Sequence, residues 1–80
     1  MMSLQYVPDL IYDAGQTGGG ELIKSLFLKT EALISGQIIE VILNEPSVKE
    51  DLLTWVRIQK HTLLDRKDFG ESSYYYIEKR

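Results

Sequence analysis

Apolar and polar positions follow two different periods along this chain, and the change of period separates strands from helices. The apolar run at residues 10–12, preceded by a proline and closed by an aspartate, predicts a first strand. Over residues 21–35 the apolar positions recur at helical spacing until Gly36, which predicts a helix that ends there. The positions expected to face the core are Leu22, Ile23, Leu26, Phe27, Leu33 and Ile34.

The middle of the chain predicts a strand followed by a second helix. β-branched residues dominate residues 37–43, whose length and flanks favour a strand over a helix. Ser47 and Glu50 have the spacing of a capping box, so the second helix is expected to run from Ser47 to about Lys60. Its apolar stripe, in which the indole ring is the large anchor on the sheet, is Val48, Leu52, Trp55, Val56 and Ile58.

The end of the chain predicts a hairpin. Residues 61–65 and 73–77 are expected as two strands, and the charged segment 66–71 between them contains a glycine that suits a turn. The order is then βαβαββ, and right-handed crossovers place both helices on one face. The chain therefore predicts an α/β (α+β) two-layer sandwich with a mixed four-stranded sheet. We expect one domain over residues 1–80, with residues 1–9 as an N-terminal arm or edge extension.

The composition excludes several kinds of chemical site. The 80 residues contain no cysteine and one histidine, which excludes disulfides, thiolate zinc sites and any thiol nucleophile. We expect no metal and no cofactor. The net charge of -3 and the pI near 5.0 argue against broad binding to nucleic acid or to an anionic membrane. The chain shows neither a signal-like N-terminus nor an apolar stretch of roughly 18 residues, so we expect a cytoplasmic protein.

The segment Gly18-Gly19-Gly20-Glu21-Leu22 opens the first predicted helix. Glycines there leave backbone amides unobstructed, and a helix N-terminus is a ready site for phosphate, sulfate or carboxylate. The simpler interpretation is a flexible turn in which Glu21 satisfies the helix dipole and repels an incoming anion. Both interpretations stay open, and these five residues are the candidate binding site.

Three carboxylates and the histidine are the other titratable candidates. Asp13, Glu45 and Asp51 would suit a divalent cation or acid–base chemistry if the fold brought them together. Structural roles are the simpler expectation, with a turn at Asp13, a helix start at Glu45 and an exposed position for Asp51. His61 is expected to cap a helix end or bond a backbone carbonyl rather than act as a base.

The last predicted strand carries an alternative binding site. Tyr74 and Tyr76 share one face of that strand, and Tyr75 points to the other. Lys79 and Arg80 follow, so stacking rings stand beside basic groups, the mixture that RNA or single-stranded nucleic acid uses. Tyrosines are also good strand formers, and packing at the core or the edge is the simpler interpretation.

Several residues match one known pattern at fixed spacing. The run from Asp13 to Leu22 is similar to the motif Asp-x-x-Gly-x-x-Cys-Pro-x-Pro, with Gly19 in the place of the cysteine. Further anchors, over residues 10 to 64, are Gly36, residues 37–41, Glu45-Pro46, Asp51-Leu52, Trp55 and His61. With these anchors the chain resembles the TusA/SirA-like sulfur-carrier family, in which the cysteine carries a persulfide at a helix N-terminus.

The resemblance implies a two-layer fold and a surface at the first helix start that meets sulfur-donor or sulfur-acceptor proteins. It does not extend to sulfur carriage, because Gly19 has no thiol and the two prolines that stiffen the motif are replaced by Gly20 and Leu22. We expect a non-enzymatic protein, without catalytic residues, that binds or regulates a soluble protein partner in sulfur trafficking or tRNA thiolation. The alternative is an RNA or single-stranded nucleic-acid binder that uses Tyr74, Tyr76, Lys79 and Arg80.

Overall fold

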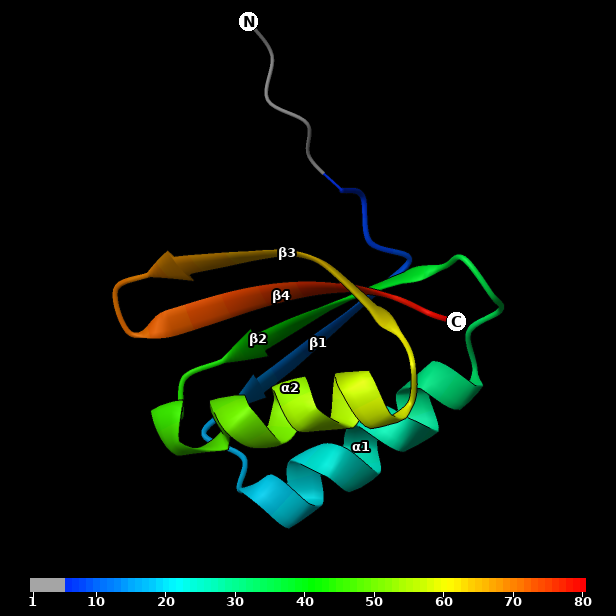
Figure 1. Ribbon diagram of the computed structural model, residues 1–80. Helices are drawn as coiled ribbons and strands as arrows, with labels where there is room; N and C mark the ends of the chain where they lie inside the picture. The colour runs from blue at the N-terminus through cyan, green and yellow to red at the C-terminus, as the bar shows by residue number, and fades with distance from the viewer. Residues whose placement is uncertain (1–5) are drawn as a thin grey trace, which may run out of the picture.

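The computed structural model describes residues 6–80, which form a four-stranded sheet and two α-helices (Figure 1). The order is the predicted βαβαββ, with a short 3₁₀-helix before the second α-helix. The elements are β1 (Leu10–Gly15), α1 (Gly19–Glu31), β2 (Ile38–Leu43), η1 (Pro46–Val48), α2 (Lys49–Ile58), β3 (Thr62–Phe69) and β4 (Ser72–Glu78). Within this range no helix is long and apolar enough to cross a membrane.

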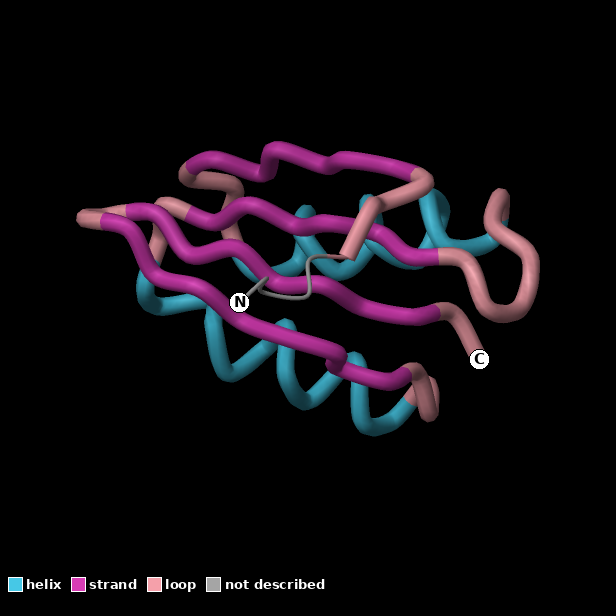
Figure 2. Tube along the Cα trace, turned by 90° about the horizontal axis from the view of Figure 1, so that it is seen from above, coloured by secondary structure: helices cyan, strands magenta, loops and turns pink. Residues whose placement is uncertain are grey.

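The sheet is mixed, with the strand order β1-β2-β4-β3. β1 and β2 are parallel neighbours, whereas β4 runs antiparallel to both β2 and β3 and lies between them. β2 and β3 therefore point the same way, so each helix connects two parallel strands, and both helices cover the same side (Figure 1). Seen from above, the strands lie in front and the helices behind (Figure 2). The predicted two-layer sandwich is confirmed.

The core lies between the sheet and the two helices. Alternation along each strand sends every second side chain towards the helices. Trp55 is 6% exposed and is the large anchor of α2, as predicted. Burial of apolar area stabilises the fold by about 25 cal/mol per Å². The buried apolar residues are Ala14, Leu22, Leu26, Ile39, Val41, Leu43, Val48, Leu52, Trp55, Val56, Tyr75 and Ile77.

The first helix differs from its predicted limits. α1 begins at Gly19, before the predicted Glu21, and ends at Glu31 rather than at Ser35. Beyond its end the backbone turns, and the carboxamide oxygen of Gln37 accepts a hydrogen bond from the Ile34 N–H at 3.0 Å. This side chain offers the backbone a partner outside the helix, which favours a turn over a further helical turn.

Three residues predicted to face the core are exposed instead. Phe27, Ile34 and Ile58 are 46%, 70% and 64% exposed. Apolar spacing placed them in the helix stripes, but the sheet covers only a narrow part of each helix surface. Leu22 and Leu26, one helical turn apart, fill that part of α1.

The second helix starts without the predicted capping box. Ser47 donates its N–H and its hydroxyl to Glu45 Oε2, at 3.3 and 2.8 Å. The hydroxyl is thereby directed back to Glu45, and residues Pro46–Val48 form η1 before α2 begins at Lys49. The carboxylate of Glu45 caps the start of η1, which is the role at a helix start that was expected for it.

The hairpin has a shorter turn than the predicted segment 66–71. β3 continues to Phe69, which pairs with Ser72, so Gly70 and Glu71 form the turn. Gly70 has φ +58°, a conformation that glycine adopts at low cost. The charged residues of β3 are held by cross-strand contacts instead of forming a loop, since Ser73 donates its hydroxyl to Asp68 Oδ1 at 2.7 Å.

The predicted arm is described from Tyr6 onward, and residues 1–5 of the prediction lie outside the described residues. The N–H of Asp9 donates to the Ile38 carbonyl at 2.7 Å, and its Oδ2 accepts from the Ile38 N–H at 2.8 Å. This pairing continues the contact of β1 with β2. The Tyr6 ring then lies 6.2 Å from the Tyr76 ring, on the side of the sheet away from the helices.

Candidate functional site

The connection from β1 to α1 is held by local hydrogen bonds. Asp13 Oδ1 accepts from the Gly15 N–H at 3.1 Å, which is the turn role expected for this carboxylate. Gly15 has φ +55°, a region that favours glycine. The hydroxyl and the N–H of Thr17 both donate to the Ala14 carbonyl. The helix start is therefore presented by a defined turn.

The five predicted binding residues divide into two groups at this helix start. Leu22 is fully buried and belongs to the core. Gly19 and Gly20 line a groove, while Gly18 and Glu21 are exposed beside it. The structure therefore brings part of the predicted site together, and a charge at Leu22 would disrupt the core rather than test a surface.

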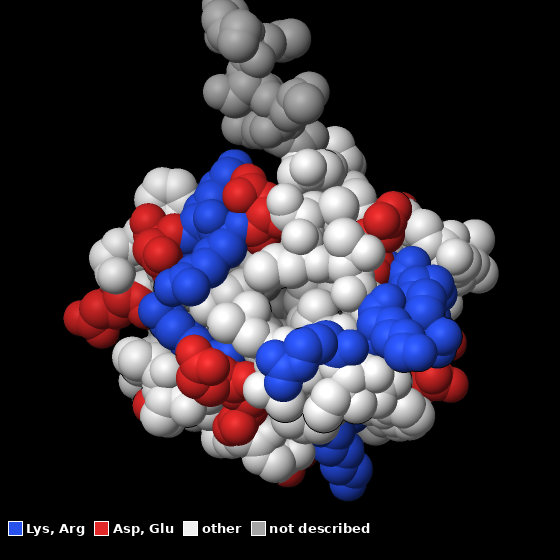
Figure 3. Space-filling model, in the orientation of Figure 1, with Lys and Arg blue, Asp and Glu red and all other residues white. Residues whose placement is uncertain are grey.

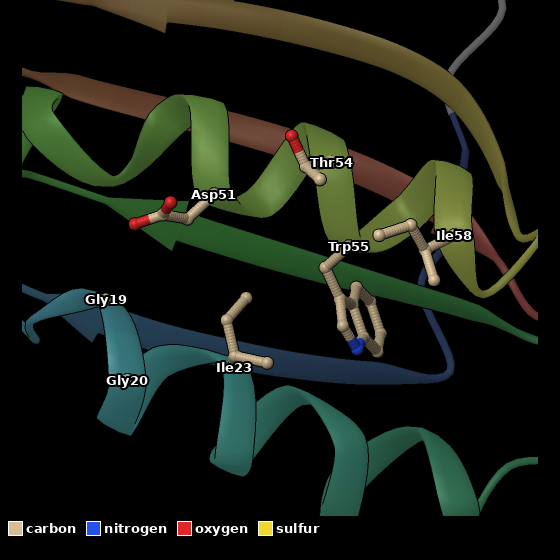
Figure 4. Close-up of a pocket in the computed structure, with 7 residues that line it drawn as sticks. All are labelled: Gly19, Gly20, Ile23, Asp51, Thr54, Trp55 and Ile58. Atoms are coloured by element: carbon tan, nitrogen blue, oxygen red, sulfur yellow. The ribbon is translucent and has the colours of Figure 1, made fainter.

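The groove lies between the start of α1 and the length of α2 and has a volume of about 530 Å³ (Figure 4). Ile23 rises from α1 and the Trp55 ring descends from α2 to meet it. Asp51 extends from α2 towards the Gly19 end. The mostly apolar lining suits an apolar side chain or a short segment of a partner. It consists of Gly19, Gly20, Ile23, Asp51, Thr54, Trp55 and Ile58.

Asp51 fills the space that any side chain at residue 19 would occupy. A Cβ built on Gly19 would lie 2.6 Å from Asp51 Oδ2 and 3.6 Å from its Cγ. The carboxylate thus brings negative charge to the positive end of the α1 dipole. Asp51 is exposed, as expected, but its meeting with Gly19 was missed, because nothing local in the sequence relates residues that belong to two different helices.

The remaining titratable candidates serve the fold. Among residues 6–80, no group of three or more acidic or histidine side chains is placed to hold a metal ion. His61 Nδ1 accepts from the Arg80 N–H at 3.1 Å, and its ring lies 5.2 Å from the Trp55 ring. The expected bond to a carbonyl is thus replaced by a bond from a backbone donor. Burial, together with the charges of Lys79 and Arg80, lowers the pKa of His61.

The residues of the alternative nucleic-acid site are not gathered on one surface. Tyr74 and Tyr76 share one face and Tyr75 the other, as the strand period predicted, and it is Tyr75 that is buried among the core residues. Lys79 Nζ instead donates to the Thr30 carbonyl of α1 at 2.6 Å, on the helix side. On the face shown in Figure 3, basic and acidic side chains are interspersed rather than separated into a basic patch.

The described residues form a two-layer fold with a mostly apolar groove beside a glycine-rich helix start that has no thiol. No protein-family model matches the chain. The chain is similar to the sulfur carrier protein TusA of Pseudomonas putida, with 27% identity over 75 residues, or 94% of each chain. This match confirms the resemblance found in the sequence, and the chain contains no cysteine.

Proposed function

We propose that this protein is a non-catalytic binding or regulatory partner in sulfur trafficking or tRNA thiolation, acting in the cytoplasm. The observation that carries the proposal is that Gly19 stands at the carrier-like helix start where the resemblance puts the thiol of a sulfur carrier. A protein that retains a carrier-like shape without the sulfur-accepting group can bind the partners of a carrier without transferring sulfur.

The groove supports recognition of a protein partner. The groove has an apolar lining supplied by Ile23, Trp55 and Ile58, and Asp51 supplies a carboxylate at one end. A partner that inserts an apolar side chain and places a donor at Asp51 would satisfy both parts of the groove. Ile58 is 64% exposed, so it is available for such a contact.

Competition with a carrier tests the proposal. Immobilised protein is exposed to a Pseudomonas putida extract, retained sulfur-transfer proteins are identified by mass spectrometry, and purified TusA from that organism is then added in excess. We expect a retained sulfurtransferase to be released by TusA, because both proteins use the same surface of the partner.

Two variants of similar exposure give the control. Ile58→Glu places a charge in the groove, and Leu28→Glu places the same charge on α1 outside the groove lining, where residue 28 is 60% exposed. Retention should be lost only with Ile58→Glu. If Ile58→Glu and TusA both leave retention unchanged, the proposal is wrong, and retention of RNA instead of a protein would support the nucleic-acid alternative.

A further inference from the structure

The side of the sheet away from the helices is unusually rich in apolar and aromatic groups. We call it the open face, and Figure 2 looks onto it. A sheet face that meets only water normally carries polar side chains. Here Ile11 and Phe69 are 60% and 63% exposed. The other apolar side chains of the open face are Tyr6, Ile38, Ile42, Tyr74 and Tyr76.

Aromatic contacts organise the open face. Phe69 packs edge-on against Tyr74 with ring centres 5.7 Å apart, and Tyr6 lies over Tyr76. The Tyr76 hydroxyl donates to Glu40 Oε2 at 2.8 Å, and this hydrogen bond restricts the orientation of the Tyr76 ring. Rings that are already held by neighbours lose little conformational freedom when a partner covers them.

Charge on the open face is predominantly negative. Register places Asp65 opposite Tyr76 and Lys67 opposite Tyr74, so both side chains belong to this face. The Lys67 ammonium lies 5.6 Å from the centre of the Tyr76 ring. Among the described strand residues, this one ammonium is accompanied by the carboxylates of Asp13, Asp65 and Glu78, whereas the carboxylate of Glu40 is buried and accepts from Tyr76.

The negative charge of the open face favours some kinds of binding partner over others. Nucleic acid is bound chiefly by exchange of phosphate counterions for Lys and Arg, and the open face offers mostly carboxylates. A second copy of the chain would bring the same negative charge against itself. A basic partner is attracted by the three accessible carboxylates, and its apolar groups would cover Ile11, Tyr74 and Phe69.

We infer that the open face docks a basic amphipathic helix of a partner protein, which would form a third layer over the sheet. Helices are the elements that ordinarily cover the faces of sheets with parallel strands. Four strands at about 4.8 Å spacing span roughly 14 Å, a width that a helix of about ten residues crosses at about 1.5 Å per residue. An apolar stripe would meet the rings, and flanking Lys or Arg would reach the carboxylates.

The inference is independent of the groove. The groove lies between α1 and α2, on the helix side, whereas the open face lies on the other side of the sheet. A partner could occupy either surface while the other stays free, so the two proposals fail or succeed separately.

The test is a titration followed by NMR of the ¹⁵N-labelled protein. The probe is a synthetic helical peptide with a leucine stripe flanked by lysines, and the control peptide has glutamate in place of every lysine. We expect amide shifts along the outward residues of β1, β3 and β4 with the basic peptide and none with the acidic peptide.

A matched pair of variants locates the contact. Ile11 on the open face and Leu28 on α1 are each 60% exposed, so substitution of either leaves the core intact. Ile11→Lys should weaken binding by at least about tenfold, because it removes an apolar contact and adds repulsion, whereas Leu28→Lys should leave it unchanged.

Three results would overturn the inference. One is equal binding of the acidic peptide, which would remove the role of charge. Another is a set of shifts confined to the α1–α2 groove. The third is binding of a single-stranded oligouridylate to Tyr74 and Tyr76 where the basic peptide does not bind, which would make the open face a nucleic-acid platform.

Discussion

The carboxylate of Asp51 stands where a side chain at Gly19 would have to be, with Oδ2 2.6 Å from the position of a Cβ. These two residues come from different helices and meet at the mouth of the groove (Figure 4). Only a glycine at residue 19 allows the carboxylate to take this position. The helix start therefore presents an internal carboxylate to a partner, and a free anion would have to compete with it.

Alanine substitutions measure this relationship. Gly20 has open space around a built Cβ, and neither Gly19 nor Gly20 has a positive φ, so Gly20→Ala should raise the free energy of unfolding by about 0.5 kcal/mol. Gly19→Ala should gain less, because the Asp51 side chain must rotate away. Urea denaturation of both variants in the wild-type and Asp51→Ala backgrounds checks this. Equal gains at residue 19 in both backgrounds would contradict it.

The Tyr76–Glu40 pair predicts a stability change at high pH. The hydrogen bond to Glu40, with burial and the carboxylate charge, raises the pKa of Tyr76 to about 12. Because this folded-state pKa lies above the unfolded value near 10, the contribution is complete below pH 10 and is lost as pH rises through about 12. Absorbance titration of the tyrosinates follows it. Glu40→Gln should bring the Tyr76 pKa down towards 10, and an unchanged pKa would remove Glu40 as the cause.

His61 predicts a stability change at acidic pH. Burial, then the Lys79 and Arg80 charges, lowers its pKa below the ordinary 6.5, and its Nδ1 is an acceptor that protonation would abolish. A depressed pKa means that the contribution is complete above pH 6.5 and is lost as pH falls through the folded-state value. NMR titration of the imidazole protons gives that value directly. Thermal melts should show a smaller loss below pH 6.5 for His61→Gln than for the wild type.

Loss of the hydroxyl should lower stability at Tyr76 but not at Tyr75. Tyr75 is fully buried, and its hydroxyl has no hydrogen-bond partner among the described residues. Tyr75→Phe should leave stability equal or raise it by up to about 1 kcal/mol. Tyr76→Phe should lower stability by roughly 1–3 kcal/mol, because Glu40 loses its donor. Urea denaturation of both variants measures these changes, and a loss with Tyr75→Phe would indicate a bonded hydroxyl.

The element order and several single-residue roles followed from the sequence, because they depend on contacts between near neighbours. The period of two placed Tyr75 on the opposite face from Tyr74 and Tyr76, and the Asp13 turn closes within two residues. The helix limits predicted from the pattern differ from those in the structure. The end of α1 and the start of α2 depend on Gln37 and Glu45, whose side chains bond the backbone outside each helix.

The candidate site was only partly predictable for the same physical reason. Glycines at a helix start are recognisable from the local sequence, and Gly19 and Gly20 do line the groove. Their companion Asp51 comes from α2, and Leu22 proved to be core because the sheet covers it. Such contacts depend on how the crossovers pack the two helices together. The spacing of residues along the chain does not reveal which residues of different helices come close in space.

The sequence by itself determined the order of strands and helices, the glycines at the first helix start and the absence of a thiol, because periodicity, glycine positions and composition are properties of the chain alone. Only the tertiary structure decided that β4 lies between β2 and β3, that Lys79 bonds α1 at Thr30, and that the open face collects rings and carboxylates. These features bring together residues that are far apart in sequence. They arise when the strands pair with one another and the helices cover one face of the sheet.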